Sequence, residues 1–218
     1  MSRCVHIFGG LGTKAIHYKY AIEVYHANNF NPFFYESRYA NSLTLRHVNQ
    51  HVTAACKNDP NGTIIHVNSA GYYSGVMFHK QATNNKLFVC ESGPVESDAE
   101  RLIYVHEQLY NFKCPVIIRN NIQTILKCIG VPTKKNDPEL MQQFQQNANQ
   151  ISNFVCLTSK NDHIIDNAFI DTVVRNIRDH GGNAERHLFT KGSHHNLSKS
   201  ETLKYQELLD AAIKKIEL

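Results

Sequence analysis

The sequence predicts an α/β fold built on a mostly parallel sheet. Short apolar runs alternate along the chain with segments in which apolar side chains recur at helical spacing. Parallel strands need crossover connections, so this alternation indicates right-handed strand–helix–strand units. The 218 residues are 42% hydrophobic and 19% charged, which fits a globular domain large enough for a substantial core. We therefore expect residues 1–218 to form a single domain.

The elements of the N-terminal half are marked by apolar runs and by the turn residues that follow them. Ile16, Tyr20 and Val24 recur at helical spacing after the first run, and Ser42 is a suitable N-cap for the second helix. We expect strands at residues 4–8, 32–36, 63–67 and 86–90, and helices at residues 16–27, 43–57 and 72–80.

The C-terminal half returns to this pattern after an irregular stretch. A helix with an acidic start is expected over residues 97–110, and two helical pieces interrupted by Gly130, Pro132 and Pro138 follow it. The stretch from about residue 95 to 150 is predicted to form a small helical cap over the functional site. Beyond it we expect strands at residues 154–158 and 185–189, and helices at residues 164–179 and 200–216.

Composition excludes several classes of function. The net charge is +4, and the basic residues do not form a stripe with interleaved aromatics, so no nucleic-acid partner is expected. The sequence contains no apolar run long enough to span a membrane, and its start does not resemble a signal peptide. The six cysteines lie far apart without a C-x-x-C pair, which favours a reducing, cytoplasmic location.

The third expected strand ends in a possible nucleophile elbow. Val67-Asn68-Ser69-Ala70-Gly71 places a serine between a β-branched run and a helix, which is the layout of the G-x-S-x-G motif of hydrolases. The first glycine of that motif is Val67 here. Small residues are needed beside the serine because its backbone turns tightly against the following helix. Ala70 and Gly71 meet that need on one side, and a plain strand-to-helix turn is the alternative interpretation.

Two later loops supply a possible acid and a possible base. A serine hydroxyl needs a general base, and the base needs an orienting carboxylate. Asp162 follows the 154–158 strand, with Asp166 as the alternative acid at the start of the next helix, and His194 or His195 follows the last strand. The resulting order, Ser69 then acid then histidine, is the order found in α/β-hydrolases. Asp162 and His194 are preferred for their distance past the strand ends.

The remaining site residues are expected in the first two loops at the carboxyl edge of the sheet. Backbone amides of Leu11 and Ala70 are the expected donors to an oxyanion, because in this fold one donor follows the nucleophile and the other lies after an earlier strand. Gly10 and Tyr72 are expected to contact the substrate, and the Tyr72-Tyr73 pair suggests an apolar acyl group.

These motifs together resemble the α/β-hydrolase-like family of transmembrane protein 53 and the fungal PaxU-type proteins. The resemblance implies an α/β-hydrolase fold with a Ser-Asp-His site, and it does not name a substrate. The matching motifs, in chain order, are Gly10-Leu11-Gly12, His66-Val67-Asn68-Ser69-Ala70-Gly71, Glu91-Ser92-Gly93-Pro94, Thr158-Ser159-Lys160-Asn161-Asp162 and Ser193-His194-His195.

Three other interpretations compete with a hydrolase. Gly10-Leu11-Gly12-Thr13-Lys14-Ala15 matches the G-x-G-x-x-A dinucleotide-binding fingerprint, with Glu36 where a ribose-binding acid would stand. An α/β-hydrolase fold can also serve as a catalytically inactive binding or scaffold protein. His47 and His51 have the i, i+4 spacing of metal ligands, but a third ligand is not evident.

The sequence as a whole favours a serine hydrolase that cleaves an ester or related acyl bond of a small molecule. We expect no metal and no organic cofactor, because the proposed Ser-Asp-His chemistry needs neither. The sequence does not indicate the oligomeric state.

Overall fold

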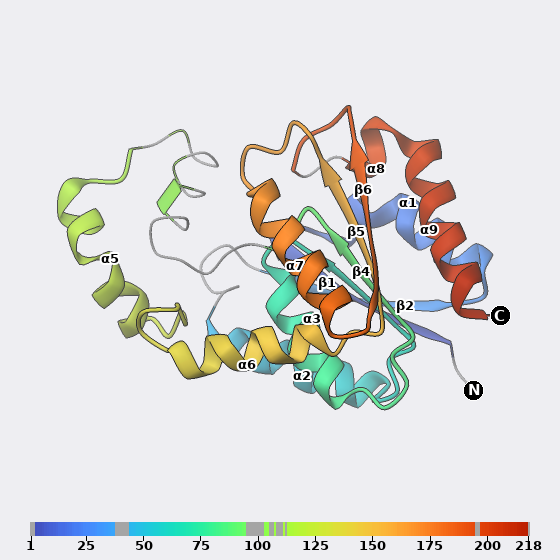
Figure 1. The fold of residues 1–218 in the computed structure, drawn as a ribbon, viewed down its shortest axis with the longest axis horizontal. Coiled ribbons are helices and arrows are strands. Elements are labelled where there is room, and N and C mark those ends of the chain that lie inside the picture. The colour runs from blue at the N-terminus through green and yellow to red at the C-terminus, as the bar shows by residue number, and fades with distance from the viewer. Residues whose placement is uncertain are drawn as a thin grey trace.

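The computed structural model describes residues 3–37, 44–94, 103–104, 107, 111, 113–194 and 197–217. It contains a six-stranded parallel sheet with the order β2-β1-β3-β4-β5-β6 (Figure 1). The predicted α/β fold with a parallel sheet is therefore confirmed. The strands are β1 (Cys4–Leu11), β2 (Asn31–Ser37), β3 (Ile64–Asn68), β4 (Leu87–Glu91), β5 (Asn153–Ser159) and β6 (Asn183–Phe189).

Helices cover both faces of this sheet (Figure 1). One face carries a 3-10 turn at Ala15–Tyr18, α1 (Lys19–Ala27), the short α8 (Leu197–Ser200) and α9 (Thr202–Glu217). The other face carries α2 (Leu45–Asn58), α3 (Gly71–Gln81), α6 (Pro138–Asn149) and α7 (Asn167–Asp179). Helix α5 (Val116–Cys128) projects away from the sheet, on the left in Figure 1.

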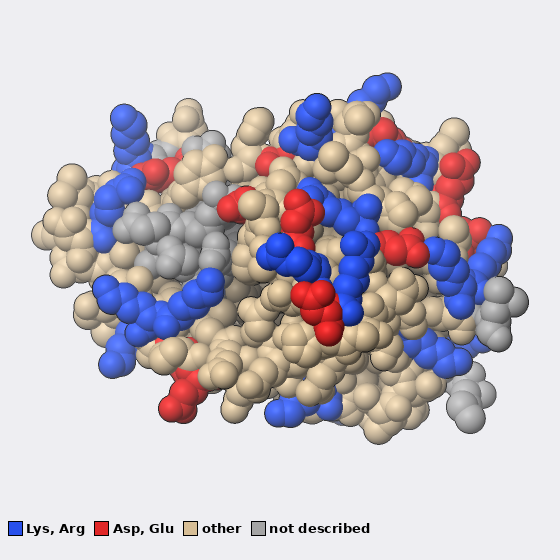
Figure 2. Space-filling model, viewed as in Figure 1, with Lys and Arg blue, Asp and Glu red and all other residues tan. Residues whose placement is uncertain are grey.

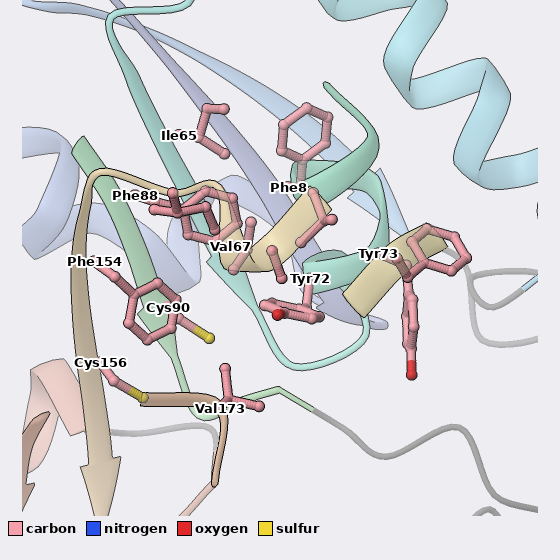
Figure 3. Packing of buried hydrophobic residues seen from close by; sticks show 14 of the residues in the cluster. Phe8, Ile65, Val67, Tyr72, Tyr73, Phe88, Cys90, Phe154, Cys156 and Val173 are labelled. Carbon is pink, nitrogen blue, oxygen red and sulfur yellow. The ribbon is translucent and has the colours of Figure 1, made fainter. Parts of the chain in front are cut away.

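The central strands are apolar on both faces because both faces are covered. Along β3, Ile64 packs in the core beneath α1 and α9, whereas Ile65 and Val67 pack in the core beneath α3 and α7 (Figure 3). Successive side chains of a strand point to opposite faces, so a strand between two helical layers is mostly apolar. The buried His6 of β1 and His66 of β3 are exceptions, and the Nδ1 of each lies 2.8 Å from a tyrosine hydroxyl, that of Tyr35 and Tyr25 respectively. The continuous apolar runs of the sequence therefore correspond to these buried strands.

Several helix starts differ from the sequence-based expectation because a different residue caps them. The Thr44 hydroxyl accepts a hydrogen bond from the His47 N–H at 3.3 Å, so α2 begins at Leu45, whereas the expected cap Ser42 lies outside the described residues. Asp166 caps α7 by accepting from the Ala168 N–H at 2.9 Å, so residues 164–166 belong to the preceding loop. Most of the helix expected over residues 97–110 also lies outside the described residues.

The strand order brings the first and third loops together. Strand β1 lies between β2 and β3, so the chain leaves β1 toward one side of the sheet for β2 and returns to the other side for β3. In open parallel sheets ligands bind at such a switch point, beyond the carboxyl ends of the strands. Gly10 near the end of β1 and Ser69 just after β3 flank this position. Among the helices of the described ranges, none combines the length and apolar character needed to cross a membrane.

Candidate active site

Ser69 lies in a tight turn between β3 and α3. Its φ of 49° is in the left-handed region, which non-glycine residues rarely adopt. Two backbone hydrogen bonds hold this conformation: the Ser69 N–H donates to the Glu91 carbonyl at 3.1 Å, and the Ser69 carbonyl accepts from the Tyr72 N–H at 3.1 Å. Strained backbone of this kind persists where the surroundings over-determine it. The turn therefore has the geometry expected of a nucleophile elbow.

Glycines on α3 make this turn possible. A Cβ on Gly71 would lie 2.2 Å from the Phe8 carbonyl oxygen, so only glycine lets α3 begin this close to β1. A Cβ on Gly75 would lie 2.2 Å from Val67 Cγ1. The missing side chain of Gly75 therefore leaves the space that the Val67 side chain occupies. Val67 replaces the first glycine of the motif, and a glycine further along the helix compensates for it.

His194 connects Ser69 to Asp162. Its Nδ1 lies 2.9 Å from Asp162 Oδ2, and its Nε2 lies 3.0 Å from Ser69 Oγ. A carboxylate can only accept, so the Nδ1–H donates to Asp162 and leaves Nε2 to accept from the serine hydroxyl. All three side chains are buried. They come from the loops after β3, β5 and β6, as the sequence predicted for the carboxyl edge of the sheet.

Asp162 is held as a carboxylate by several donors. Burial alone would raise its pKa, but the hydrogen bond from His194 together with those from the Ile164 and Ile165 N–H groups lowers the pKa below its usual value. Those two amides donate to Asp162 Oδ1 at 2.9 and 3.1 Å, while Oδ2 accepts from His194. The carboxylate is thus ionised and oriented before any ligand binds.

The two alternative site residues, Asp166 and His195, do not join the contacts between Ser69, His194 and Asp162 among the described residues. Asp166, the alternative acid, uses its carboxylate to cap α7, and no hydrogen bond joins it to His194 among the described residues. His195, the alternative base, lies outside the described residues. The structure therefore brings Asp162 and His194 to Ser69 and gives Asp166 a role in helix capping.

Of the expected oxyanion donors and substrate contacts, Gly10 and Ala70 lie beside the serine, whereas Leu11 pairs with Ser37 of β2. Gly10 is adjacent to the serine, because a Cβ there would lie 3.0 Å from Ser69 Cβ and 2.5 Å from Asn68 Oδ1. Leu11 is the last residue of β1. Ala70 is buried, with helical backbone angles directly before α3, where helix amides favour negative charge.

Tyr72 lines a cavity of about 310 Å³ between α3, α6 and α7. Its ring lies edge-on to that of Tyr73, with the centroids 5.9 Å apart. Ser69 and His194 do not line this cavity, so Tyr72 is the part of the predicted site that reaches it. Its other walls combine apolar side chains such as Met141, Phe144 and Phe169 with the polar side chains of Lys134, Gln142, Gln145 and Asn149.

Sequence reasoning missed two features that support the elbow. One is Gly75, which makes room for Val67. Its position eight residues after Val67 is the only feature of the sequence that could have indicated this contact. The other is Glu91. Its backbone carbonyl accepts a hydrogen bond from the Ser69 N–H, and its buried carboxylate accepts one from the Tyr205 hydroxyl at 2.8 Å. Burial and then the negative charge of Glu91 raise the pKa of Tyr205, so this hydroxyl stays protonated and donates. A signal for this contact could only have come from knowing that α9 packs against the end of β4.

The metal interpretation is not supported by the geometry. His47 and His51 do lie close, with ring centroids 4.1 Å apart. However, the His51 ring nitrogens are within hydrogen-bond distance of the Glu36 carbonyl (3.0 Å) and of the Ser74 hydroxyl (3.3 Å). Within the described ranges there is no group of three or more His, Cys, Asp or Glu residues able to hold a metal ion.

The dinucleotide interpretation also fits poorly. The order β2-β1-β3-β4-β5-β6 differs from the 3-2-1-4-5-6 order usual in dinucleotide-binding sheets. Gly10 is explained without a pyrophosphate, because a Cβ there would lie 2.5 Å from Asn68 Oδ1, whereas the fingerprint uses its glycines to let a pyrophosphate approach.

Comparisons with known proteins agree with this architecture. No family model and no curated protein matches the sequence. The fold is similar to that of an esterase from Pyrococcus furiosus, with a TM-score of 0.67 and 11% identity over 98% of this chain and 83% of the other. It is also similar to carboxyl esterase 2 of Tuber melanosporum (0.66, 10% identity, 98% and 77% covered). A monoacylglycerol lipase of Paleococcus ferrophilus is a third such structure (0.64, 11% identity, 98% and 93% covered). The chain therefore has the α/β-hydrolase fold.

Proposed function

We propose that this protein is a serine hydrolase that cleaves an ester or related acyl bond. The observation that carries the proposal is the pair of hydrogen bonds that His194 makes to Ser69 and Asp162, at 3.0 and 2.9 Å. Titratable and nucleophilic groups arranged in this order can activate a serine hydroxyl at neutral pH. The structural neighbours named above are esterases and a lipase, which supports the same reaction class at low sequence identity.

In the proposed mechanism the serine attacks the acyl carbon while His194 takes its proton. Ser69 Oγ bonds to the carbonyl carbon, and His194 Nε2 then gives the proton to the leaving alcohol as the tetrahedral intermediate collapses. A water molecule releases the acyl group by the same steps with the roles of water and serine exchanged. Asp162 keeps the Nδ1–H in place and stabilises the imidazolium. Amides of Leu11 and Ala70 would stabilise the oxyanion.

The substrate is proposed to be a small molecule with an apolar acyl group. Gly10 would contact it beside Ser69, and Tyr72, which also lines the cavity between α3, α6 and α7, would contact its acyl group. The stretch from about residue 95 to 150 is expected from the sequence to form a helical cap; its helix α6 lines this cavity and would help to select the acyl group. The motif order also supports membership of the transmembrane protein 53 and PaxU-type family. The free cysteines of the chain are consistent with a cytoplasmic location.

A fluorophosphonate probe tests the proposal without knowledge of the substrate, because it labels an activated serine. A further structure of this fold, esterase 2 of Thermogutta terrifontis, was captured phosphonylated by sarin (TM-score 0.58, 13% identity, 99% of this chain and 83% of that chain covered). We expect label on the wild type, none on Ser69→Ala, and strongly reduced labelling of His194→Ala. His195→Ala is the matched control and should label normally.

Two results would contradict this proposal. Labelling that persists in Ser69→Ala would place the reactive group elsewhere. A correctly folded wild type that does not label would favour the alternative of an inactive α/β-hydrolase-fold binding protein, and nucleotide titration would then test the dinucleotide interpretation.

A further inference from the structure

Helix α5 exposes an unusual number of apolar side chains. Val116 and Ile117 in its first turn are 71% and 73% exposed. Ile118, Ile125 and Ile129, spaced by seven and four residues, form an exposed stripe along the same helix and its C-cap. Exposed apolar residues are common singly, but at about 3.6 residues per turn Ile117, Ile118, Ile125 and Ile129 share one side of α5. Val116 lies on the other side. Four exposed apolar residues on one side form a patch of the kind that marks an interaction site.

Basic residues surround this apolar surface. Lys113, Arg119, Lys127, Lys134 and Lys135 are all exposed, and residues 113–136 contain no Asp or Glu. Arg119 is paired with Glu107 at 2.6 Å. Among the described residues, the next acidic side chains after this stretch are Asp137 and Glu139, at the start of α6. Figure 2 shows several Lys and Arg side chains, together with fewer Asp and Glu side chains, around the end of the molecule that carries α5 in Figure 1.

We propose that this surface, formed by α5 and the loop to Lys135, docks onto anionic lipid membranes. An interfacial helix lies in the membrane plane with its apolar side chains in the acyl boundary and Lys or Arg beside the head groups. Anionic head groups attract each basic side chain near the surface, and this attraction adds to apolar burial. The helix would lie on the membrane and not cross it, in agreement with the absence of a spanning helix among the described residues.

The charge distribution argues against self-association as the occupant. A second copy would bring the same excess of positive charge against this surface, and like charges repel across a desolvated contact. An anionic lipid surface instead complements that charge and buries the apolar side chains.

The proposal does not depend on the hydrolase activity, because docking is measured as binding. Ser69 is held by β3, β4 and α3, whereas the docking surface lies on α5. If the chain is also a hydrolase, docking would bring it to substrates that partition into membranes.

The chain contains no tryptophan, which permits a direct test. Ile117→Trp would place a single fluorophore in the proposed surface, and Leu203→Trp on α9, at 76% exposure, is the matched control. Phosphatidylcholine vesicles with phosphatidylserine should shift the emission of Ile117→Trp to shorter wavelength and leave Leu203→Trp unchanged. Phosphatidylcholine alone should give a much smaller shift, and high salt should weaken the effect.

Sedimentation with the same vesicles gives a second measurement on the tryptophan-free protein. Ile117→Asp combined with Ile118→Asp should weaken binding at least tenfold, and Leu203→Asp should leave it unchanged. Both replaced residues are exposed, so the thermal unfolding curve should stay close to that of the wild type. Equal binding of all variants would overturn the proposal. Emission shifts that depend on protein concentration without vesicles would also overturn it, in favour of self-association.

Discussion

Replacing Gly75 by alanine should destabilise the protein although alanine is the better helix former. The change alone should gain about 1 kcal/mol of helix propensity. The new Cβ would, however, lie 2.2 Å from Val67 Cγ1, far inside the ~3.5 Å of an ordinary carbon contact. Overpacking of this kind costs about 1–3 kcal/mol and sometimes more. We take the upper end and expect Gly75→Ala to lower the free energy of unfolding by about 2 kcal/mol, or the melting temperature by about 4–8 °C.

A double-mutant cycle separates this contact from other effects of the substitution. Val67→Ala removes the methyl that the new Cβ would meet and costs about 2 kcal/mol through lost burial and a cavity. In that background Gly75→Ala should be neutral or slightly stabilising, because the remaining contacts, with Ile65 Cγ2 and Phe88 Cζ at 3.2 Å, need only small adjustments. The coupling between the two substitutions should therefore be about 2 kcal/mol.

Urea denaturation followed by circular dichroism measures all four proteins, and equal m-values allow the midpoints to be compared. The reasoning would be refuted if Gly75→Ala were as stable as the wild type. It would also be refuted if the two substitutions were additive within about 0.5 kcal/mol, because Gly75 would then not provide the space for Val67.

Three further predictions concern ionisable groups. Asp162→Asn should slow fluorophosphonate labelling by about 100- to 10,000-fold because the histidine tautomer is no longer fixed. Asp166→Ala should leave labelling unchanged and lower the free energy of unfolding by about 1 kcal/mol through loss of a helix cap. Equal effects of the two variants on labelling would contradict the choice of Asp162 as the acid. The pKa of Asp162 is lowered, so its carboxylate stabilises the fold above the unfolded pKa, and the stability deficit of Asp162→Asn should shrink as the pH falls through the folded pKa. Burial lowers the pKa of His6 to about 4, so the unfolded chain takes up its proton first and stability should fall by about 3 kcal/mol between roughly pH 6.5 and 4. His6→Gln, which cannot titrate, should flatten that decline in pH-dependent urea melts, and an unchanged slope would show that other groups cause it.

Strand positions could be predicted because their physical cause is local. Each central strand is buried on both faces, so residues such as Ile64 and Ile65 are both apolar and the run is visible in sequence. Parallel strands then bring their following loops to one edge, which was enough to select Ser69, Asp162 and His194 as candidates. The sequence offered a weaker basis for choosing between Asp162 and Asp166 as the acid. The choice depended on a helix start that the sequence placed three residues too early, at Ile164.

Features that depend on packing between elements were not predictable. The substitution of Val67 for glycine looked like a defect of the elbow, because the compensating Gly75 faces it only when α3 lies across β3. Thr44 caps α2 where the sequence predicted Ser42. Serine and threonine are both good N-cap residues, so the sequence alone did not distinguish them. The contact of Glu91 with Tyr205 joins residues 114 positions apart.

The elbow of this protein shows why a motif is better read as a set of spatial requirements than as fixed letters. The first glycine of G-x-S-x-G provides space between the strand and the helix behind it. That space can be provided from either side of the contact, here by Gly75 on α3 facing Val67 on β3. A Cβ on Gly71, by contrast, would collide with the backbone carbonyl of Phe8. Every residue carries this carbonyl, so no substitution at position 8 could make room for a side chain at position 71. Positions that face side chains are therefore free to exchange with their neighbours, whereas positions that face backbone keep their glycine. The elbow sequence here differs from the pattern at Val67 and agrees with it at Gly71, as this reasoning requires.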